Sequence, residues 1–185
     1  MRSGAILVVG IGPGSLQLLT PDAREAIESA DMILGYGTYL DLIEKLAPGV
    51  PRESTGMREE VLRVQRAIEL ACQGATVALI SGGDAGIYGM AGLVFEMLAA
   101  RHVAMPVRVI PGVSAINAAA ALLGAPLMTD FAAISLSDQL VPLDEIASRI
   151  EMAALAGFVI ALYNPKGRRR TEPFDLACQI LLRYR

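Results

Sequence analysis

The chain has 185 residues, of which 54% are hydrophobic, so it can bury one large core or two smaller ones. Its formal net charge of −3 argues against a general nucleic-acid-binding surface, and we expect no nucleic-acid partner. Its apolar runs are broken by glycine, proline or charge, and the longest, residues 118–128, falls short of the roughly 20 residues of a membrane-spanning helix.

Few residues in the sequence suit a metal site or a catalytic base. Cys72 and Cys178 are far apart and lack the spacing of a zinc site or a disulfide framework. The single histidine, His102, follows Arg101 at the expected end of a helix, where a solvated position is favoured over a catalytic one. We therefore expect no metal and no Ser-His-Asp mechanism. Glycine and proline at residues 10–14 interrupt the apolar run of residues 5–9 at once, which disfavours a signal peptide, so we expect a cytoplasmic protein without a membrane partner.

The first predicted element is a strand over Ala5–Val9, a continuous apolar run of the kind that a parallel sheet covers on both faces. A glycine-rich loop, residues 10–14, follows the strand. Thr20 and Pro21 then predict the start of a helix, with Thr20 as its N-cap.

The order of strand, glycine loop and helix is also that of a dinucleotide-binding fold, but the details disfavour a nicotinamide cofactor. Ser15 stands where the third glycine of that fingerprint belongs, and Pro13 has no N–H for a pyrophosphate. The next acidic candidate, Asp31, precedes the second predicted strand, residues 32–34, instead of ending it.

The following segments predict a turn and two helices. Residues 35–40 form a turn rich in glycine and tyrosine that leads into a short helix, and this turn suits a plain connection as well as a substrate-facing loop. Residues 57–72 carry apolar residues at helical spacing, which predicts an amphipathic helix packed on the sheet. We expect Arg58, Arg63 and Arg66 to lie on its solvated surface.

The chain is organised around residues 81–89, a turn with four glycines in nine residues that follows an apolar strand, residues 75–80. Glycine has no Cβ and accepts positive φ, so this turn can bring bare backbone close to a ligand at the carboxyl edge of a sheet. Asp84 supplies a negative charge there. A tight turn with a purely structural role is the alternative.

A third junction of strand, loop and helix follows. The expected helix, strand, loop and helix cover residues 90–100, 107–110, 111–115 and 116–123. Because parallel strands end at one edge of a sheet, the loops after Val9, Ile80 and Ile110 are expected to lie side by side. A ligand can then lie across all three loops.

A second series of elements begins after Pro126, and we place a domain boundary near residues 124–130, between domains of residues 1–125 and 126–185. The expected strand, helix, strand and helix cover residues 130–138, 143–150, 158–162 and a segment that starts near 171. Two strands make a thin sheet, so the second domain looks incomplete at Arg185.

Three of these stretches, taken in order, resemble the tetrapyrrole methylase family of S-adenosylmethionine-dependent methyltransferases. They are Gly10-Ile11-Gly12-Pro13-Gly14 with Leu18-Leu19-Thr20, Ser81-Gly82-Gly83-Asp84, and Pro111-Gly112-Val113-Ser114-Ala115. The resemblance implies a two-domain α/β fold with a parallel-sheet N-terminal domain, a homodimer, and S-adenosylmethionine in the cleft between the domains. Family members continue through further strands, so the chain is expected to be a fragment or to have a short second domain.

Within the family, five stretches resemble the subgroup that methylates carbon 17 of precorrin-3B, with ring contraction, in cobalamin (vitamin B12) biosynthesis. These stretches are residues 35–39, 55–60, 84–92, 135–138 and 161–165. Two alternatives stay open: a tetrapyrrole methylase that acts at another ring position, and a non-catalytic cofactor-binding module.

The resemblance also implies roles for individual residues. The implied cofactor contacts are Pro13, Gly83, Asp84, Ile87, Ser114 and Ala115, with Tyr163 and Asn164 from the second domain. Ring contraction needs proton transfers, and the candidates, which also suit ordinary loop positions, are Tyr88, Ser137 and Asp138. A tetrapyrrole with carboxylate arms suits three consecutive cations that could instead form a solvated loop, Arg168, Arg169 and Arg170.

Overall fold

The structure is a computed structural model that describes residues 4–56, 58–125, 127–139, 141–167 and 170–184. The chain divides into two compact units, Met1–Ala118 and Ala119–Arg185, and the division falls inside helix α5 (Ala115–Leu123). The predicted domain boundary near residues 124–130 stays a prediction.

The described residues of the first unit form a five-stranded sheet in the order β3-β2-β4-β1-β5, and its strand pairings are parallel. The strands are β1 (Ala5–Gly10), β2 (Met32–Tyr36), β3 (Arg52–Thr55), β4 (Thr76–Ser81) and β5 (Val107–Ile110). Since the strands run the same way, the loops that follow β1, β4 and β5 leave from one edge of the sheet, as the sequence predicts.

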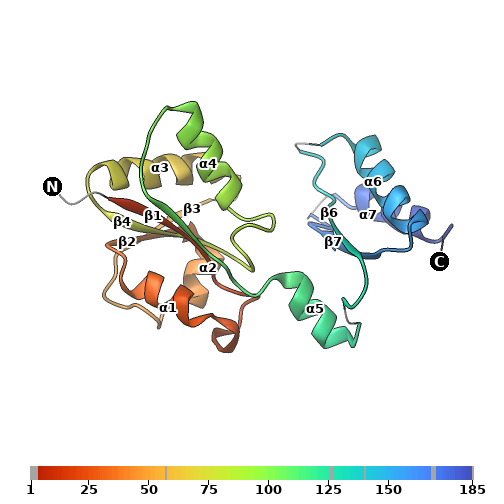
Figure 1. Cartoon of the computed structure of the whole chain (residues 1–185), viewed down its shortest axis with the longest axis horizontal. Coiled ribbons are helices and arrows are strands. Elements are labelled where there is room, and N and C mark those ends of the chain that lie inside the picture. Colours follow the sequence, from red (N-terminus) through yellow and green to blue (C-terminus); the bar gives the residue numbers. More distant parts are fainter. Residues whose placement is uncertain (1–3, 57, 126, 140, 168–169, 185) are drawn as a thin grey trace. The chain divides into compact units, whose positions relative to one another are not determined.

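Helices cover both faces of this sheet (Figure 1). They are α1 (Pro21–Glu28), α2 (Gly37–Leu42), α3 (Glu60–Cys72) and α4 (Ala91–Ala100), and a short 3-10 helix, η1 (Leu16–Leu18), precedes α1. Side chains of α1 and α2 share a core with Val9, whereas those of α3 and α4 share a second core with Ile6 and Val8. β1 is thus buried on both faces, which explains its uninterrupted apolar sequence.

Helix α1 begins where the sequence predicts. The Thr20 hydroxyl accepts a hydrogen bond from the backbone N–H of Ala23 (3.2 Å), and Pro21 occupies the first helical position. Pro21 has no N–H to leave without a partner there, and its fixed φ suits a first turn.

The structure contains one strand, β3, that the sequence does not predict. The strand reads Arg52-Glu53-Ser54-Thr55, and these polar residues show no alternation of apolar and polar character. β3 lies at an edge of the sheet. Polar side chains are common in edge strands because one side of the strand has no neighbouring strand and meets solvent. The helix predicted from residue 57 also starts later, at Glu60.

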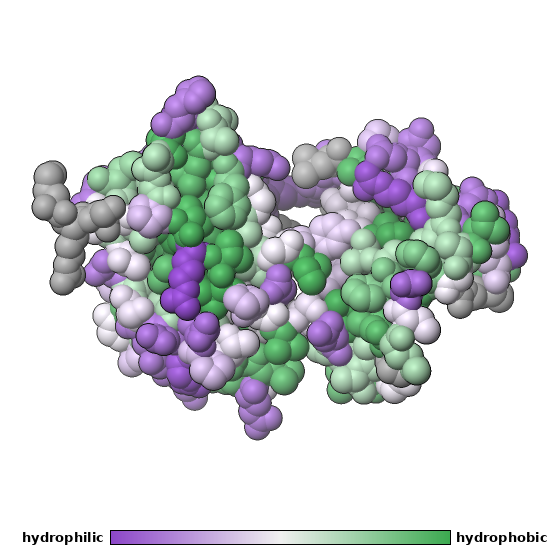
Figure 2. All heavy atoms as spheres, viewed as in Figure 1, coloured by the Kyte–Doolittle hydropathy of each residue, from purple (hydrophilic) through white to green (hydrophobic). Residues whose placement is uncertain are grey.

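β5 lies at the opposite edge of the sheet. Hydrophobic surface extends over the side of the first unit that carries β5 (Figure 2), and Val109 is exposed there. Arg108 places a charge in the same strand and forms an ion pair with Asp22 (3.3 Å). Charges of this kind hinder pairing of an edge strand with another chain.

In the second unit, the described residues form a two-stranded parallel sheet of β6 (Phe131–Ser135) and β7 (Val159–Tyr163). Helices α6 (Leu143–Leu155) and α7 (Glu172–Leu181) pack with it around a core that contains Leu136, Ile146 and Ile150. The predicted order of strand, helix, strand and helix is confirmed. Within the described part of the chain, no helix is both long and apolar enough to cross a membrane.

Candidate functional site

Two of the three glycine loops are joined through their backbones. The loop after β1 meets the loop after β4 where the N–H of Gly12 donates to the carbonyl of Gly83 (3.0 Å) and the N–H of Gly83 donates to the carbonyl of Gly12 (2.8 Å). The N–H of Ile11 donates to the carbonyl of Ser81 (2.9 Å) just before them. Both glycines have positive φ, +76° and +67°, which a side chain would strain.

The loop after β5 joins them at van der Waals contact. A Cβ on Gly112 would lie 2.2 Å from the carbonyl oxygen of Gly83 and 2.6 Å from that of Gly10. A Cβ on Gly10 would in turn lie 2.7 Å from the backbone nitrogen of Gly112. These glycines are therefore required for the loops to touch each other, and Gly10, Gly12 and Gly83 are buried where they meet.

The topology places these loops where open α/β sheets bind ligands. The neighbouring strands β1 and β4 are followed by α1 and α4, and these two helices pack on opposite faces of the sheet. The chain therefore leaves in opposite directions from adjacent strand ends, the position at which open α/β sheets commonly bind ligands. Gly12 and Gly83 lie at this position.

Asp84 fastens the loop after β4 to the loop after β5. One carboxylate oxygen accepts from the N–H of Gly86 (2.8 Å) and the other accepts from the N–H of Gly112 (3.0 Å). Asp84 is half-buried, so each oxygen keeps lone-pair capacity beyond these bonds. The expected contact between Asp84 and a cofactor stays a prediction, to which the structure adds a second role in joining two loops.

The start of α5 completes this group of loops. The Ser114 hydroxyl is buried, donates to the Asn117 side-chain oxygen (3.0 Å) and accepts from the Asn117 N–H (3.4 Å). The backbone nitrogen of Ala115 lies 3.5 Å from the position of a Cβ on Gly83. The structure thus brings Gly83, Asp84, Ser114 and Ala115 together, as the sequence predicts for neighbouring loops.

The remaining candidates of the first unit are exposed residues of the same loops. Pro13 follows Gly12, and Ile87 and Tyr88 follow Asp84 on the turn after β4. Tyr88 has a φ of +52°, an uncommon conformation for an aromatic residue. The proton-transfer role suggested for Tyr88 stays a prediction.

Tyr39 is a neighbour of the site that the sequence analysis does not single out. A Cβ on Gly82 would lie 2.8 Å from the Tyr39 ring, so the ring packs on the glycine turn. The ring also makes an edge-to-face contact with Tyr36, with centroids 5.8 Å apart. Residues 35–40 are not the turn that the sequence predicts but the end of β2 and the start of α2, and Tyr39 of α2 packs against the glycine turn. A substrate-facing role of this segment stays a prediction.

Arg63 corrects the expectation of a solvated arginine face on α3. It is buried, and its guanidinium donates to the Thr55 hydroxyl (2.6 Å), the Gly56 carbonyl (3.0 Å) and the Met90 sulfur (3.7 Å). Burial lowers the pKa of Arg63, an effect that the nearby carboxylates of Glu60 and Glu59 oppose. Arg63 thus ties the end of β3 to the start of α4, next to the glycine turn.

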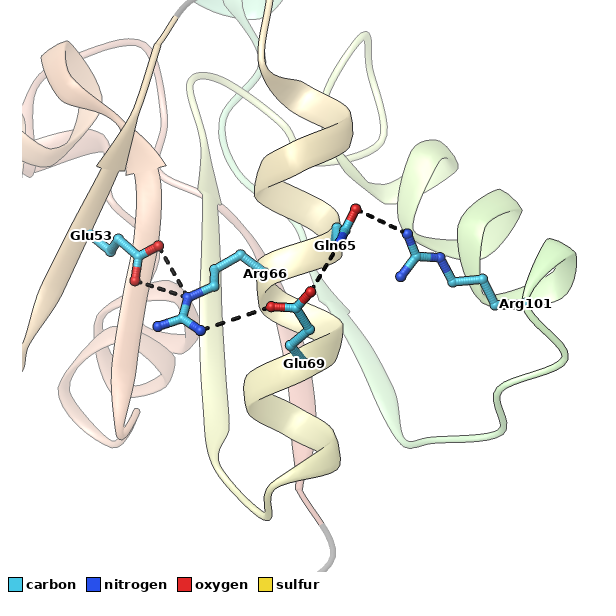
Figure 3. A network of polar contacts seen from close by, with 5 residues as sticks. All are labelled: Glu53, Gln65, Arg66, Glu69 and Arg101. Atoms are coloured by element: carbon cyan, nitrogen blue, oxygen red, sulfur yellow. Dashed lines mark hydrogen bonds and ion pairs between the residues drawn. The ribbon is translucent and has the colours of Figure 1, made fainter.

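The neighbouring arginine, Arg66, does lie on the surface. It pairs with Glu53 (3.0 Å) and with Glu69 (3.9 Å), and Gln65 links Glu69 to Arg101 (Figure 3). These side chains come from β3, α3 and the end of α4. Arg58 is exposed as well, so the expectation fails at Arg63 alone.

In the second unit, the predicted site residues gather at the ends of β6 and β7. The Arg170 guanidinium forms an ion pair with Asp138 (3.3 Å) and donates to the carbonyls of Leu136 (2.5 Å) and Asn164 (3.0 Å). The Asn164 side chain donates to the Ser135 hydroxyl (3.0 Å). Ser137 and Tyr163 lie in the same strand ends.

Arg168 and Arg169, which are predicted to bind the substrate, lie outside the described residues. Within the described ranges, no group of three or more histidine, cysteine, aspartate or glutamate side chains is placed to hold a metal ion.

Comparison with known proteins yields one family and several relatives. The family model of the Tetrapyrrole (Corrin/Porphyrin) Methylases matches residues 5–185. A cobalt-factor III methyltransferase of Priestia megaterium is 54% identical over 98% of this chain and 34% of its own length. A probable cobalt-factor III C(17)-methyltransferase of Salmonella typhimurium is 52% identical over 91% of this chain and 72% of its own length. A precorrin-3B C(17)-methyltransferase of Sinorhizobium sp is 43% identical over 97% of this chain and 73% of its own length.

Two solved structures share the fold. The methyltransferase CobJ matches with a TM-score of 0.91 at 38% identity, over 99% of this chain and 77% of its own. A uroporphyrin-III C-methyltransferase from Thermus thermophilus, complexed with S-adenosylhomocysteine, matches with a TM-score of 0.71 at 25% identity, over 97% of this chain and 76% of its own. The chain thus spans about a third of the first relative's length and about three quarters of the others'.

Proposed function

Because the chain belongs to the tetrapyrrole methylase family, we propose that it is an S-adenosylmethionine-dependent methyltransferase of cobalamin biosynthesis. It methylates carbon 17 of its tetrapyrrole, with ring contraction. The observation that carries this proposal is the convergence of three glycine loops at the switch point of the sheet, in a chain whose relatives are named for that methylation.

The cofactor site of this proposal is the backbone surface made by the three loops. The fit rests on what the described residues offer: three loops whose backbones meet at Gly12, Gly83 and Gly112, and a half-buried carboxylate at Asp84. In support, the related uroporphyrin-III C-methyltransferase structure contains S-adenosylhomocysteine. Contacts from Pro13, Ile87, Ser114 and Ala115 belong to the same proposal, as do those from Tyr163 and Asn164.

When bound, the cofactor supplies a methyl group that its sulfonium sulfur already activates. The protein therefore needs to hold the acceptor carbon in line with that methyl and to exclude other geometries. Holding two reactants in such an arrangement is worth roughly 7–11 kcal/mol of activation free energy. A site built mainly from backbone, rigidified by paired loops and by the Asp84 bonds, is suited to that task.

We further propose that the substrate carries cobalt. Four relatives named for cobalt-factor III are 54%, 52%, 47% and 41% identical to this chain, so three of them exceed the 43% of a relative named for precorrin-3B. Turnover of cobalt-factor III that exceeds turnover of precorrin-3B supports this choice, and the opposite preference contradicts it. Action as a cytoplasmic homodimer stays a prediction.

Calorimetric titration with S-adenosylhomocysteine tests the cofactor assignment, with NAD as the control ligand. We expect S-adenosylhomocysteine to bind and NAD not to bind. Asp84→Ala is expected to weaken binding, because it removes a charge and releases Gly86 and Gly112. Unchanged affinity in that variant contradicts the role of Asp84, and binding of NAD alone contradicts the methyltransferase.

A further inference from the structure

Arg170 connects the two strand ends of the second unit. Its Nη1 atom donates to the Leu136 carbonyl (2.5 Å) and lies 3.3 Å from the Asp138 carboxylate, and its Nη2 atom donates to the Asn164 carbonyl (3.0 Å). Leu136 and Asp138 follow β6, whereas Asn164 follows β7. We call Arg170 and these three partners the clasp.

The contacts leave Arg170 poorly suited to bind a substrate carboxylate. A guanidinium binds a carboxylate best through two parallel N–H groups, and the pair on the two Nη atoms of Arg170 already has acceptors in its own chain, which leaves only the Nε edge for a ligand. Its side chain is 27% exposed, and the anion beside it is Asp138. Asp138 is correspondingly engaged as the partner of this cation.

The clasp also explains how Asn164 is held. Its φ of +52° lies in the left-handed region, which asparagine adopts more readily than most residues with a side chain. Arg170 binds the Asn164 carbonyl, and the Asn164 side chain donates to the Ser135 hydroxyl (3.0 Å). The Ser135 hydroxyl also accepts a hydrogen bond from the N–H of Ser137 (3.2 Å), and this bond fixes the position of the hydroxyl at the end of β6.

We propose that Arg170 is a positioning residue: through the clasp, with Asp138 as its counter-ion, it fixes Asn164 at the end of β7 for cofactor binding. This inference rests on the proposed function, because it takes Asn164 as a cofactor contact. It is an alternative to two roles expected from the sequence, a substrate-binding Arg170 and a proton-transferring Asp138.

Three variants test the clasp: Arg170→Met, Asp138→Asn and the double variant. Arg170→Met is expected to weaken S-adenosylhomocysteine binding roughly tenfold, the size of one lost charge-assisted hydrogen bond. Asp138→Asn is expected to weaken it less, and the double variant to be no weaker than Arg170→Met, because both residues act in one unit. KM for the tetrapyrrole is expected to stay within about twofold in each variant.

Arg149→Met is the matched control. Arg149 is an exposed arginine of α6 in the second unit, and it pairs with Glu145 on its own helix. This variant removes one positive charge from the same unit without touching a strand end, so cofactor affinity is expected to remain unchanged. A loss equal to that of Arg170→Met would reveal a general charge effect and overturn the proposal.

Hydrogen exchange tests whether the clasp exists independently of whether the proposed function is correct. In Arg170→Met, the amides of residues 135–138 and 163–165 are expected to exchange faster than in the unsubstituted protein, with or without ligand. If the unsubstituted protein binds no S-adenosylhomocysteine, the proposed function fails while this exchange still decides whether the clasp exists. Unchanged exchange, or a raised KM for the tetrapyrrole with unchanged cofactor affinity, overturns the proposal in favour of substrate binding.

Discussion

Replacing Gly112 by alanine is the sharpest test of the three-loop site. The added Cβ would lie 2.2 Å from the Gly83 carbonyl oxygen and 2.6 Å from the Gly10 carbonyl oxygen. Both neighbours are backbone atoms in short loops, so neither can swing away as the end of a flexible side chain would. The loops after β1, β4 and β5 must therefore separate to admit one methyl group.

The cost follows from this overlap. Forcing a methylene or methyl group into a packed region typically costs 1–3 kcal/mol, and a clash with backbone belongs at the upper end, at about 3 kcal/mol of unfolding free energy. For a chain of this length, that loss lowers the melting temperature by roughly 6–12 °C. Urea unfolding gives the free energy directly, and calorimetry with S-adenosylhomocysteine shows whether the spread loops still bind.

Gly92→Ala is the control for this substitution. Gly92 is exposed inside α4, and a Cβ there would meet nothing within 4 Å. Because alanine is the better helix former, this variant is expected to gain about 0.5–1 kcal/mol. If Gly112→Ala proves as stable as the unsubstituted protein, the close contact of the three loops is refuted.

Two further substitutions test other parts of the first unit. Thr20→Ala removes the hydrogen bond from the Ala23 N–H at the start of α1, and is expected to cost about 1 kcal/mol of unfolding free energy in urea. Arg63→Met leaves the acceptors of a buried guanidinium without a donor, and is expected to cost about 1–3 kcal/mol, more than the exposed Arg66→Met at about 1 kcal/mol or less. The reverse order of the two arginine variants would contradict the buried position of Arg63.

The parts of the fold that the sequence predicts are those with a strong local signal. β1 and β4 are buried on both faces, so their sequences are uninterrupted apolar runs, and Thr20 with Pro21 marks a helix start. β3 escapes prediction because an edge strand can be polar throughout. Its existence depends on pairing with β2, which no pattern within Arg52–Thr55 records.

The side-chain contacts of the candidate site are likewise only partly predictable from the sequence. Glycine spacing after three strands predicts that the loops meet, but it does not tell which glycines touch one another and which would face a ligand. Arg63 reads as one charge among others on an amphipathic helix, and only the fold places it under Thr55, Gly56 and Met90. Gly112, a partner of Asp84, and Leu136 and Asp138, partners of Arg170, are likewise distant in sequence, so these contacts could not be predicted from local spacing.

The two groups of candidate residues are held by different chemistry, and substitutions in them should therefore behave differently. In the first unit, the loops touch through glycine backbone, so a change at Gly112 disturbs folding and ligand binding by the same steric overlap. At the ends of β6 and β7, the clasp is made by a partly exposed guanidinium and a carboxylate, and such pairs contribute little to stability in solvent. A variant that lowers cofactor affinity while the melting temperature changes little is therefore expected at Arg170, whereas at Gly112 both quantities are expected to fall together.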